Sequence, residues 1–427
     1  MVVPIPKQGN RQEPGNYRPI SLTAVPCKVL ESLIRDQVMS HLEENQLLTR
    51  YQHGFRPKRS CSTQLMEVID EWTSYIEEGD PVDAIYLDFK KAFDSVPHRR
   101  LLHKLETYGV AGKVKDWIAA FLLDRRQQVV VRGCSSPWVP VTSGVPQGSV
   151  LGPTLFILYI NDLPESVRSS VRIFADDTKI FDRVPSSGGP ELIQQDIDAV
   201  ASWSDLWQLP FNESKCKILH IGSNNPCYVY TMRGLELQTV ATEKDLGVHI
   251  DSSLKFRKQA ASAAAKGNQV LALVKRSFCC IDMVTLPLLY KTMVRPHLEY
   301  GNLIWGPFNR ADQRLLERVQ RRATKLVPEL KHLPYQERLK NLKLPSLYHR
   351  RQRGVMIAVY QILTRGINMQ AGQFYEPATS TTTREHHLKL RKPQASTRVR
   401  RNTISVRTIN DWNALPPSFV LSTSLNQ

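Results

Sequence analysis

Apolar residues return along this chain with two different periods, and the period in each segment predicts a helix or a strand. Residues 26–48 and 63–76 carry apolar side chains every three or four positions, which is the spacing of one face of a helix. The other expected elements are helices at residues 97–109, 148–160 and 190–206, and strands at residues 127–132 and 216–221. This βαββαβ-like order after residue 83 predicts an α+β sheet with helices packed on one of its faces.

Three aspartates lie at the tips of short apolar segments. Asp88 follows a strand-like run at residues 84–87, and Asp176 and Asp177 form the polar tip between two apolar runs, which predicts a hairpin. Any one of them alone would be an ordinary turn residue. Three carboxylates in one place repel each other, and a divalent cation removes that repulsion. Two metal ions about 4 Å apart, held by shared aspartates, suit in-line displacement at phosphorus.

The composition points to the kind of partner. The chain has 427 residues, with 57 Lys and Arg against 40 Asp and Glu, which gives a net charge of +17. This length favours two or three domains, and this charge favours a polyanion as partner. No membrane partner is expected, because the longest apolar stretch, residues 155–160, is too short to span a bilayer. The first residues also lack the apolar core of a signal peptide, so we expect an intracellular protein.

Several motifs, in this order and spacing, resemble those of reverse transcriptases. The palm motifs are YLDFKKAFDSVPH, SGVPQGSVLGPTLFILYINDLP and IFADDTKIF. Further matches are PIPKQGNRQEPGNYRPISL, YQHGFRPKRSCSTQL, LPFNESKCKILHIG and DLGVHID, and together they cover residues 1 to about 255. A weaker likeness, LEYGNLIWGP and INDWNALPPSF, reaches the C-terminus. Among reverse transcriptases, these motifs are most similar to those of non-LTR (LINE-type) retrotransposons of the jockey and CR1 kind.

The resemblance implies a right-hand polymerase. The implied domains are fingers at residues 1–80 and 98–144, a palm at 81–97 and 145–255, a helical thumb at 256–345, and a basic, partly flexible C-terminal region at 346–427. Within that last region, residues 377–408 are rich in Ser, Thr, Lys and Arg. They are interpreted either as a mobile tail that binds nucleic acid or as a solubilising linker.

The resemblance also implies a catalytic centre. Asp88 and Asp176 would hold two Mg²⁺ ions, with Mn²⁺ as an alternative, and Asp177 would lie beside them as an accessory carboxylate. The backbone carbonyl of Phe89 would be a further ligand. Lys215 would protonate the pyrophosphate leaving group, and Lys217 is the alternative donor because alternation along a strand puts both on one face.

The same resemblance implies residues that bind the incoming nucleotide. Phe93 would exclude a 2′-hydroxyl, with a core aromatic as the alternative interpretation. Gln147 would touch the nucleotide or template base, and Gly148 would keep the floor of the site open. Arg18 and Lys7 would bind the triphosphate, Arg18 through its planar fork, with a surface charge pair to Glu13 as the alternative.

Other positions would contact primer and template. Arg56, Lys58 and Arg59 would meet template phosphates, and the turn Leu246-Gly247-Val248 would hold the primer 3′ end. In the thumb, Arg321 and Arg322 would grip duplex, unless their helix face is merely solvated.

Taken together, the motifs predict an RNA-directed DNA polymerase, a nucleotidyltransferase, from a non-LTR retrotransposon protein. Its expected partners are an RNA template, a DNA primer or target and deoxynucleoside triphosphates, with an endonuclease domain on a missing upstream segment. Its expected location is the nucleus, with a cytoplasmic ribonucleoprotein stage. Two alternatives stay open: a catalytically silent nucleic-acid-binding protein, and a different polymerase with this palm, such as a group II intron maturase or a telomerase.

Overall fold

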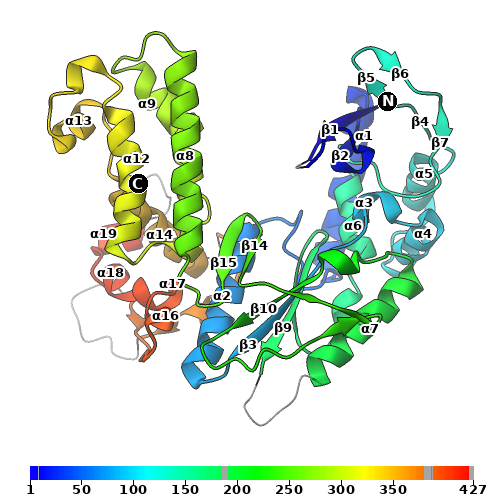
Figure 1. Ribbon diagram of the computed structural model, residues 1–427. Coiled ribbons are helices and arrows are strands. Elements are labelled where there is room, and N and C mark those ends of the chain that lie inside the picture. Colours follow the sequence, from blue (N-terminus) through cyan, green and yellow to red (C-terminus); the bar gives the residue numbers. More distant parts are fainter. Residues whose placement is uncertain (8, 185–190, 365, 379–385, 387, 423–427) are drawn as a thin grey trace.

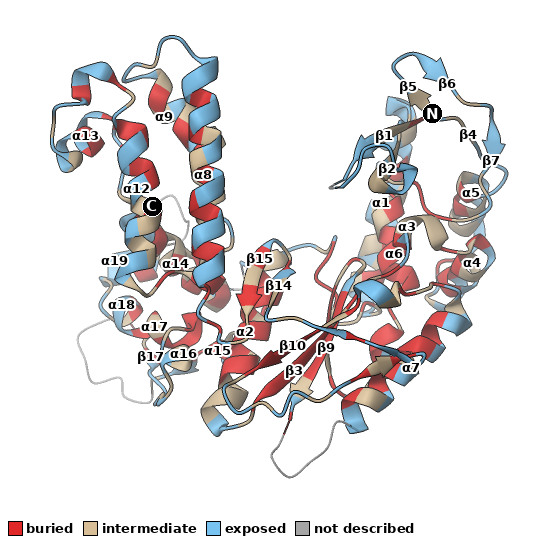
Figure 2. Cartoon of the chain, in the orientation of Figure 1, coloured by how far each residue is buried: buried red, intermediate tan, exposed pale blue. Residues whose placement is uncertain are grey.

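The computed structural model describes residues 1–7, 9–184, 191–364, 366–378, 386 and 388–422. In Figure 1 a central sheet forms the base, N-terminal strands and helices rise on one side, and a group of long helices rises on the other. Buried residues concentrate in the sheet and in the helix faces that turn toward it, as Figure 2 shows. Over the described residues, no helix has the length and apolarity needed to cross a membrane.

Five strands make the central sheet, in the order β13-β10-β3-β9-β8. They are β3 (Val82–Leu87), β8 (Ser170–Phe174), β9 (Asp177–Arg183), β10 (Lys217–Ile221) and β13 (Gln238–Thr239). All neighbours pair antiparallel except β10 and β13, which pair parallel. The predicted hairpin is therefore confirmed as β8 and β9, and the predicted strand at 216–221 as β10.

One face of this sheet is covered by α2 (Cys61–Glu78), the helix predicted at residues 63–76. Trp72 of α2 is fully buried and meets the ring of Phe181 edge-on, with the ring centres 5.5 Å apart. Ala84 of β3 belongs to the same cluster of buried residues. Although the sequence placed α2 with the fingers, the helix packs against the central sheet.

The opposite face is covered by α6 (Gly152–Tyr159) and α7 (Glu191–Trp207). Ile85 and Leu87 of β3 join these helices in a second buried cluster. Because β3 carries buried apolar side chains on both of its faces, the sheet needs helices on both faces. The prediction of helices on one face only is therefore wrong.

The N-terminal side of the molecule is built from short strands and helices. Its elements are β1 (Val2–Pro6), β2 (Tyr17–Ser21), α1 (Val25–Glu44), α3 (Ala92–Ser95), α4 (His98–Thr107) and α5 (Gly112–Leu122). The prediction of a single strand at residues 127–132 is wrong. Two two-residue strands take its place, β4 (Arg126–Gln127) and β5 (Val130–Val131), because each pairs with a different return strand.

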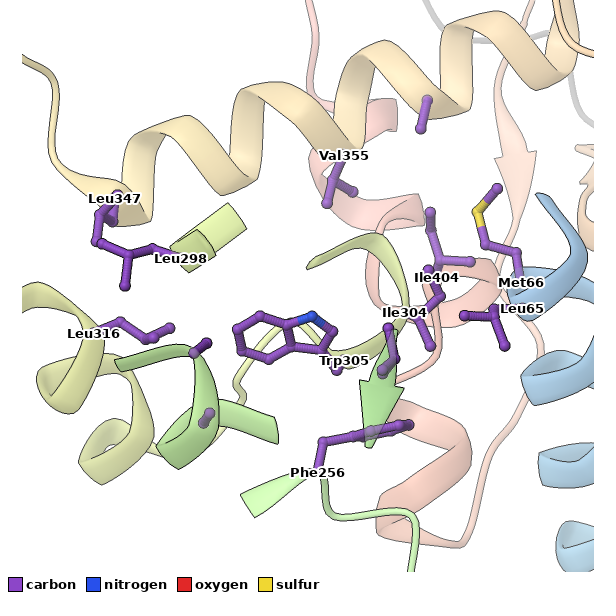
Figure 3. Packing of buried hydrophobic residues seen from close by; sticks show 14 of the residues in the cluster. Leu65, Met66, Phe256, Leu298, Ile304, Trp305, Leu316, Leu347, Val355 and Ile404 are labelled. Carbon is purple, nitrogen blue, oxygen red and sulfur yellow. The ribbon is translucent and has the colours of Figure 1, made fainter. Parts of the chain in front are cut away.

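Long helices form the region predicted as the thumb. Trp305 lies at the centre of its core, 1% exposed, among residues of α8 (Arg257–Ser277), α12 (Arg310–Thr324) and α14 (Leu347–Leu363). Figure 3 shows that the same core continues into Leu65 and Met66 of α2. The connecting helices are α9 (Thr285–Leu289), a π-helical turn (Tyr290–Val294), α10 (Arg295–Glu299), α11 (Asn302–Trp305) and α13 (Tyr335–Asn341).

Residues 388–422 fold back onto α2 and the thumb helices. Trp412 is 1% exposed, and Arg400 donates a 2.7 Å hydrogen bond to the carboxylate of Asp70 in α2. Arg407 donates to two thumb carbonyls, those of Leu303 and Gly306. Arg400 and Arg407 thus anchor this described part to α2 and the thumb, and nucleic-acid binding by residues 377–408 stays a prediction. The expectation of flexibility at 379–385, 387 and 423–427 falls outside the described residues.

The remaining elements are small. They are β6 (Cys134–Ser135), β7 (Val139–Pro140), β11 (Thr231–Met232), β12 (Leu235–Glu236), β14 (Thr242–Asp245), β15 (Val248–Asp251), β16 (Glu376–Pro377), β17 (Leu390–Arg391), α15 (Ala371–Phe374), α16 (Arg398–Arg401), α17 (Ile404–Arg407), α18 (Ile409–Asn413) and α19 (Pro417–Val420).

Candidate active site

The three predicted aspartates meet where the end of β3 lies beside the start of β9. Leu87, the last residue of β3, pairs with Thr178, so Asp88, which follows it, lies beside Asp177. Asp176 occupies the turn between β8 and β9. A cavity of about 210 Å³ opens beside Asp88 and Asp177. Antiparallel pairing thus brings together carboxylates that are 88 residues apart in sequence.

The tip of the aspartate hairpin is held by a loop that the sequence reasoning had read only for its basic residues. Gln52 Oε1 accepts hydrogen bonds from the backbone N–H groups of Gly54 (2.8 Å) and Ala175 (2.9 Å). A Cβ atom on Gly54 would lie 2.4 Å from the backbone nitrogen of Ala175, so only glycine permits this approach. The signal was available, because the motif containing Gln52 and Gly54 stands in the sequence.

The pKa of each of the three carboxyl groups is raised, which disfavours the ionised form as long as no cation lies between them. Burial raises the pKa of Asp88, although the nearby cations Lys215 and Lys7 oppose it. Burial and the charge of Asp88 raise the pKa of Asp176. Asp177 is solvent-exposed at the mouth of the site, yet loss of surrounding water and the charge of Asp176 raise its pKa to about 6. Ionising all three is therefore unfavourable without a positive charge between them.

The donor set at this point fits a hard divalent cation. Asp88 and Asp176 supply carboxylate oxygens, which Mg²⁺ prefers as ligands. Phe89 and Phe211 lie opposite each other in an isolated antiparallel bridge. The hydrogen bonds of this bridge are made by the neighbouring residues, for example from the Asn212 N–H to the Asp88 carbonyl at 2.7 Å. In the described part of the chain, no group donates a hydrogen bond to the Phe89 carbonyl itself. Within that part, no three His, Cys, Asp or Glu side chains lie close enough to form a ready metal cluster.

Lys215 is the cation nearest to Asp88. Its Nζ lies 3.9 Å from Asp88 Oδ2, and its side chain is 67% exposed. Lys217, the alternative, is tied to Glu243 by a 2.9 Å hydrogen bond. Lys215 therefore keeps a largely exposed ammonium group beside Asp88, whereas Lys217 is held by Glu243.

Arg18 and Lys7 belong to the β1–β2 hairpin and its connection. Both are exposed, and both charges act to lower the pKa of Asp176 across the site. Among the described residues Arg18 makes no ion pair with Glu13, so the surface-pair interpretation has no support. The two cations face the aspartates from the N-terminal side of the molecule.

Phe93, Asp94 and Gln147 form one connected group. The ring of Phe93 stacks on Phe156 at 4.4 Å between centres and remains partly exposed. Gln147 Nε2 donates a 3.0 Å hydrogen bond to Asp94 Oδ1. Asp94, six residues after Asp88, thus fixes the side chain of Gln147.

A comparison with known families decides the identity of this arrangement. Residues 5–257, more than half of the chain, match the family described as reverse transcriptase (RNA-dependent DNA polymerase). The chain belongs to the reverse transcriptase family. Its α+β right-hand polymerase fold and its resemblance to non-LTR retrotransposon reverse transcriptases are thereby confirmed.

Relatives of this reverse transcriptase family member come from mobile elements. The chain is 27% identical over 353 residues to the RNA-directed DNA polymerase from mobile element jockey of Drosophila funebris, covering 78% of this chain and 38% of that protein. It is 25% identical to the Pol polyprotein of the type-1 retrotransposable element R2 of Popillia japonica, covering 52% and 32%. The chain thus spans less than half the length of these curated relatives. Among solved structures, a telomerase from Candida albicans bound to a telomeric RNA fragment is similar with a TM-score of 0.42 and 11% identity, covering 81% of this chain and 64% of that one.

Gly148 of this reverse transcriptase chain has a different neighbour from the one expected. Its φ is +99°, and a Cβ atom there would lie 2.9 Å from the carbonyl oxygen of Ser21 in β2. Next to it, the Ser21 N–H donates a 2.7 Å hydrogen bond to the Gln147 carbonyl. Gly148 therefore lets β2 approach this loop, and its role at the floor of the site stays a prediction.

Of the three basic residues expected on template phosphates, one is free. Arg56 forms a two-pronged ion pair with Glu43, at 2.7 and 2.9 Å. Arg59 donates to the carbonyl of Arg50, and burial lowers its pKa. Lys58 is exposed. Template contact stays a prediction, and Lys58 is the member of the group best placed to make it.

The Leu246-Gly247-Val248 turn lies between β14 and β15, where Val248 is fully buried. Tyr300, from the thumb side, donates a 2.7 Å hydrogen bond to the Leu246 carbonyl. Next to the turn, Asp245 forms a buried ion pair with Lys179 of β9. Sequence reasoning missed Tyr300 and the Lys179–Asp245 pair, because their partners lie far away along the chain.

Arg321 and Arg322 lie on α12 and point to different neighbours. Arg322 donates a 2.9 Å hydrogen bond to Asn268 of α8. The guanidinium of Arg321 lies 4.4 Å from the ring centre of Tyr335. Binding of duplex by both residues stays a prediction. The two side chains have different neighbours, Asn268 for Arg322 and Tyr335 for Arg321.

Proposed function

We propose that this chain is an RNA-directed DNA polymerase, which extends a primer 3′-hydroxyl with deoxynucleoside triphosphates on an RNA template. The observation that carries the proposal is the meeting of Asp88, Asp176 and Asp177, with raised pKa values, in a chain of the reverse transcriptase family. Nearby carboxylates whose pKa values stay raised despite surrounding cations are typical of functional sites, and a bound metal ion would stabilise their ionised form.

Asp88 and Asp176 would hold two Mg²⁺ ions, with the Phe89 carbonyl as a further ligand and Asp177 as an accessory carboxylate; Mn²⁺ would suit the same ligands. When bound, such ions lower the pKa of the primer hydroxyl and neutralise charge on the triphosphate. The protein's own contribution is to hold these oxygens on two paired strands, whose register cannot shift without exposing the core.

The cations around the site would handle the triphosphate. Arg18 and Lys7 would bind the phosphates from the N-terminal side, since guanidinium suits phosphate geometry. Lys215, beside Asp88 and 67% exposed, would hold the proton that the pyrophosphate oxygen receives when it leaves.

The Phe93 group would select the nucleotide. The partly exposed ring of Phe93, backed by Phe156, would occupy the space that a 2′-hydroxyl needs. Gln147, fixed by Asp94, would contact the nucleotide or the template base. Gly148 would contribute indirectly, by letting β2 approach this loop.

The wider role would be that of a non-LTR retrotransposon protein. Its partners would be the template RNA and a DNA primer or target strand, and its place of action the nucleus. An endonuclease domain would act from a segment upstream of this chain. The fingers, palm and thumb boundaries at residues 80, 97, 144, 255 and 345 remain part of the proposal, with α2 packing on the palm sheet.

Primer extension on an RNA template with Mg²⁺ tests the proposal. Asp88→Asn and Asp176→Asn should each reduce the extension rate by about 10³-fold or more, because removing a ligand removes charge stabilisation that no neighbour replaces. Asp182→Asn makes the same change at the other end of β9 and should leave extension within a few-fold of wild type. If Asp88→Asn or Asp176→Asn extends the primer at the rate of Asp182→Asn, the assignment is refuted. A wild-type chain that binds primer–template but never extends the primer would favour the catalytically silent binding protein.

A further inference from the structure

The thumb contains a basic cavity that is separate from the cavity at the aspartate site. Its volume is about 600 Å³, within the range of ligand sites, and it opens between α12, α13 and the start of α14. Its charged lining consists of Arg310, Arg314, Arg318, Arg321, Arg351 and Glu317. Five arginines against one glutamate leave a strong positive charge in a single concave surface.

Arg351 is the residue that the fold does not explain. It is 8% exposed, and within the described residues it makes neither a hydrogen bond nor an ion pair. Burial lowers its pKa, with Glu317 and Glu299 opposing that effect from a distance. Its neighbour Arg350, by contrast, is paired with Glu299 at 2.5 Å. Arg351 lines the cavity and has no side-chain partner among the described residues, so an anion in the cavity would pair with its guanidinium group.

The cavity lies on the side of α12 that faces away from the polymerase site. Val319 of α12 packs toward Gly267 of α8, and Figure 1 shows α8 between α12 and the aspartate side of the molecule. Glu317 precedes Val319 by two residues, which places it about 200° away around the helix. The cavity is therefore separated from the aspartates by the body of the thumb.

Two tyrosines give the cavity flat apolar faces. Tyr348 is 48% exposed at its rim, and Tyr335 lies under the guanidinium of Arg321. The hydroxyl of Tyr335 donates to Glu317, which fixes the ring and occupies the one carboxylate of the lining. Guanidinium groups bind the phosphates of a nucleic-acid backbone, and aromatic side chains stack on unpaired bases. The lining of this cavity offers both.

We propose that this thumb cavity binds single-stranded nucleic acid through its phosphates and bases, at a site separate from the polymerase cleft. The inference goes beyond the proposed function and does not require polymerisation. An acidic peptide would use the arginines but would leave the tyrosine faces without a role. RNA and DNA should bind alike, because nothing in the lining is placed to read a 2′-hydroxyl in preference to its absence.

The test first fills the cleft with a primer–template and then adds labelled single-stranded RNA or DNA of about 6–8 nucleotides, within the usual size of such sites. Wild-type protein should bind one such oligonucleotide in addition to the primer–template. The double variant Arg314→Ala/Arg318→Ala should weaken this second binding about tenfold or more. The slope of log affinity against log salt should fall by about 0.7 for each phosphate that the variant no longer neutralises.

Two further variants separate binding from folding. Arg351→Met should abolish the second binding while the melting temperature stays the same or rises, because a buried unpaired charge is removed. Arg322→Ala removes an arginine from the α8 side of the same helix and should leave the second binding unchanged. Primer–template affinity should be unaffected by the cavity variants.

Three results would overturn the proposal. They are the absence of any second oligonucleotide at saturation, equal second binding by the Arg314/Arg318 double variant and by Arg322→Ala, and tighter binding of an oligo-glutamate peptide than of either oligonucleotide. The last result would assign the cavity to an acidic protein segment.

Discussion

The acidic side chains of α2 and those of the aspartate site differ in whether the protein itself supplies their hydrogen-bond and ion-pair partners. On α2, Asp70 accepts hydrogen bonds from Arg400 and Ser405, and Glu77 accepts them from Ser396 and Thr397. At the other end of β3, Asp88 has no cation closer than the exposed Lys215 at 3.9 Å. The first set is satisfied by the chain itself, and the second is left for something the chain binds.

Burial alone does not distinguish the two sets. Burial raises the pKa of Asp70 as it does that of Asp88, but Arg400 and Ser405 act against it. Burial would also raise the pKa of Glu77, yet the hydrogen bonds from Thr397 and Ser396 outweigh it and lower the pKa to about 2. Partners, and not depth, therefore mark a carboxylate as structural. By the same criterion, Arg351, which has no side-chain partner among the described residues, resembles the three aspartates and not Asp70 and Glu77.

The strongest way to break this comparison is to remove the cation of the structural set. Arg400→Met leaves Asp70 buried with only Ser405 as side-chain partner, and should reduce the free energy of unfolding by about 3–5 kcal/mol. Urea denaturation measures the change. The double variant Asp70→Asn/Arg400→Met should recover part of that loss, since the uncompensated charge is gone. A loss below about 1 kcal/mol in Arg400→Met would show that the C-terminal region is not held by this pair.

A change at the catalytic side should alter chemistry more than stability. Phe93→Val opens space beside the proposed sugar position and should lower discrimination against ribonucleotides by roughly 10²-fold, since each ~1.4 kcal/mol is tenfold. The measurement is the ratio of kcat/KM for the two triphosphates on one primer–template.

Phe93→Tyr keeps the ring and should keep the discrimination. An unchanged ratio in Phe93→Val, with extension intact, would make Phe93 a core residue that packs on Phe156 and nothing more.

The smallest expected effects are opposite in sign and sharpen the comparison most directly. In metal-free protein at pH 7, Glu77→Gln should lower the free energy of unfolding by about 1–2 kcal/mol, because it removes hydrogen bonds to a charged acceptor. Asp177→Asn should raise it, by less than about 1 kcal/mol because solvent screens an exposed carboxylate. Thermal unfolding in the presence of a chelator measures both.

The pH dependence of the two variants follows from the direction of each shift. The pKa of Glu77 is lowered to about 2, so its contribution is present above about pH 4.5 and disappears as the pH falls toward 2. The pKa of Asp177 is raised to about 6, so folding is opposed as the pH rises from about 4 to 6. The advantage of Asp177→Asn should therefore grow over that window. If both variants change stability in the same direction, the distinction between the two sets fails.

The sequence by itself predicted the strands and the turn that carry the three aspartates, because each of these signals is local. The apolar run before Asp88 and the two runs around Asp176 predict strands, and the polar pair between those two runs predicts a turn. The remaining step, pairing β3 with β9, follows from the need to bury those runs in register. Helices α2, α4 and α7 were predictable for the same reason, since each carries its own periodicity.

Only the tertiary structure decided which charges are paired and which faces are covered. The sequence around Asp70 does not indicate that its partner is Arg400, which lies 330 residues later. The sequence around Arg351 likewise does not indicate whether its side chain has a partner. Likewise, the period of α2 shows that one side is buried but not against which face of the sheet. Local patterns record how a segment meets water, whereas pairing between distant segments depends on where the chain brings them, and that is set by the packing of the whole molecule.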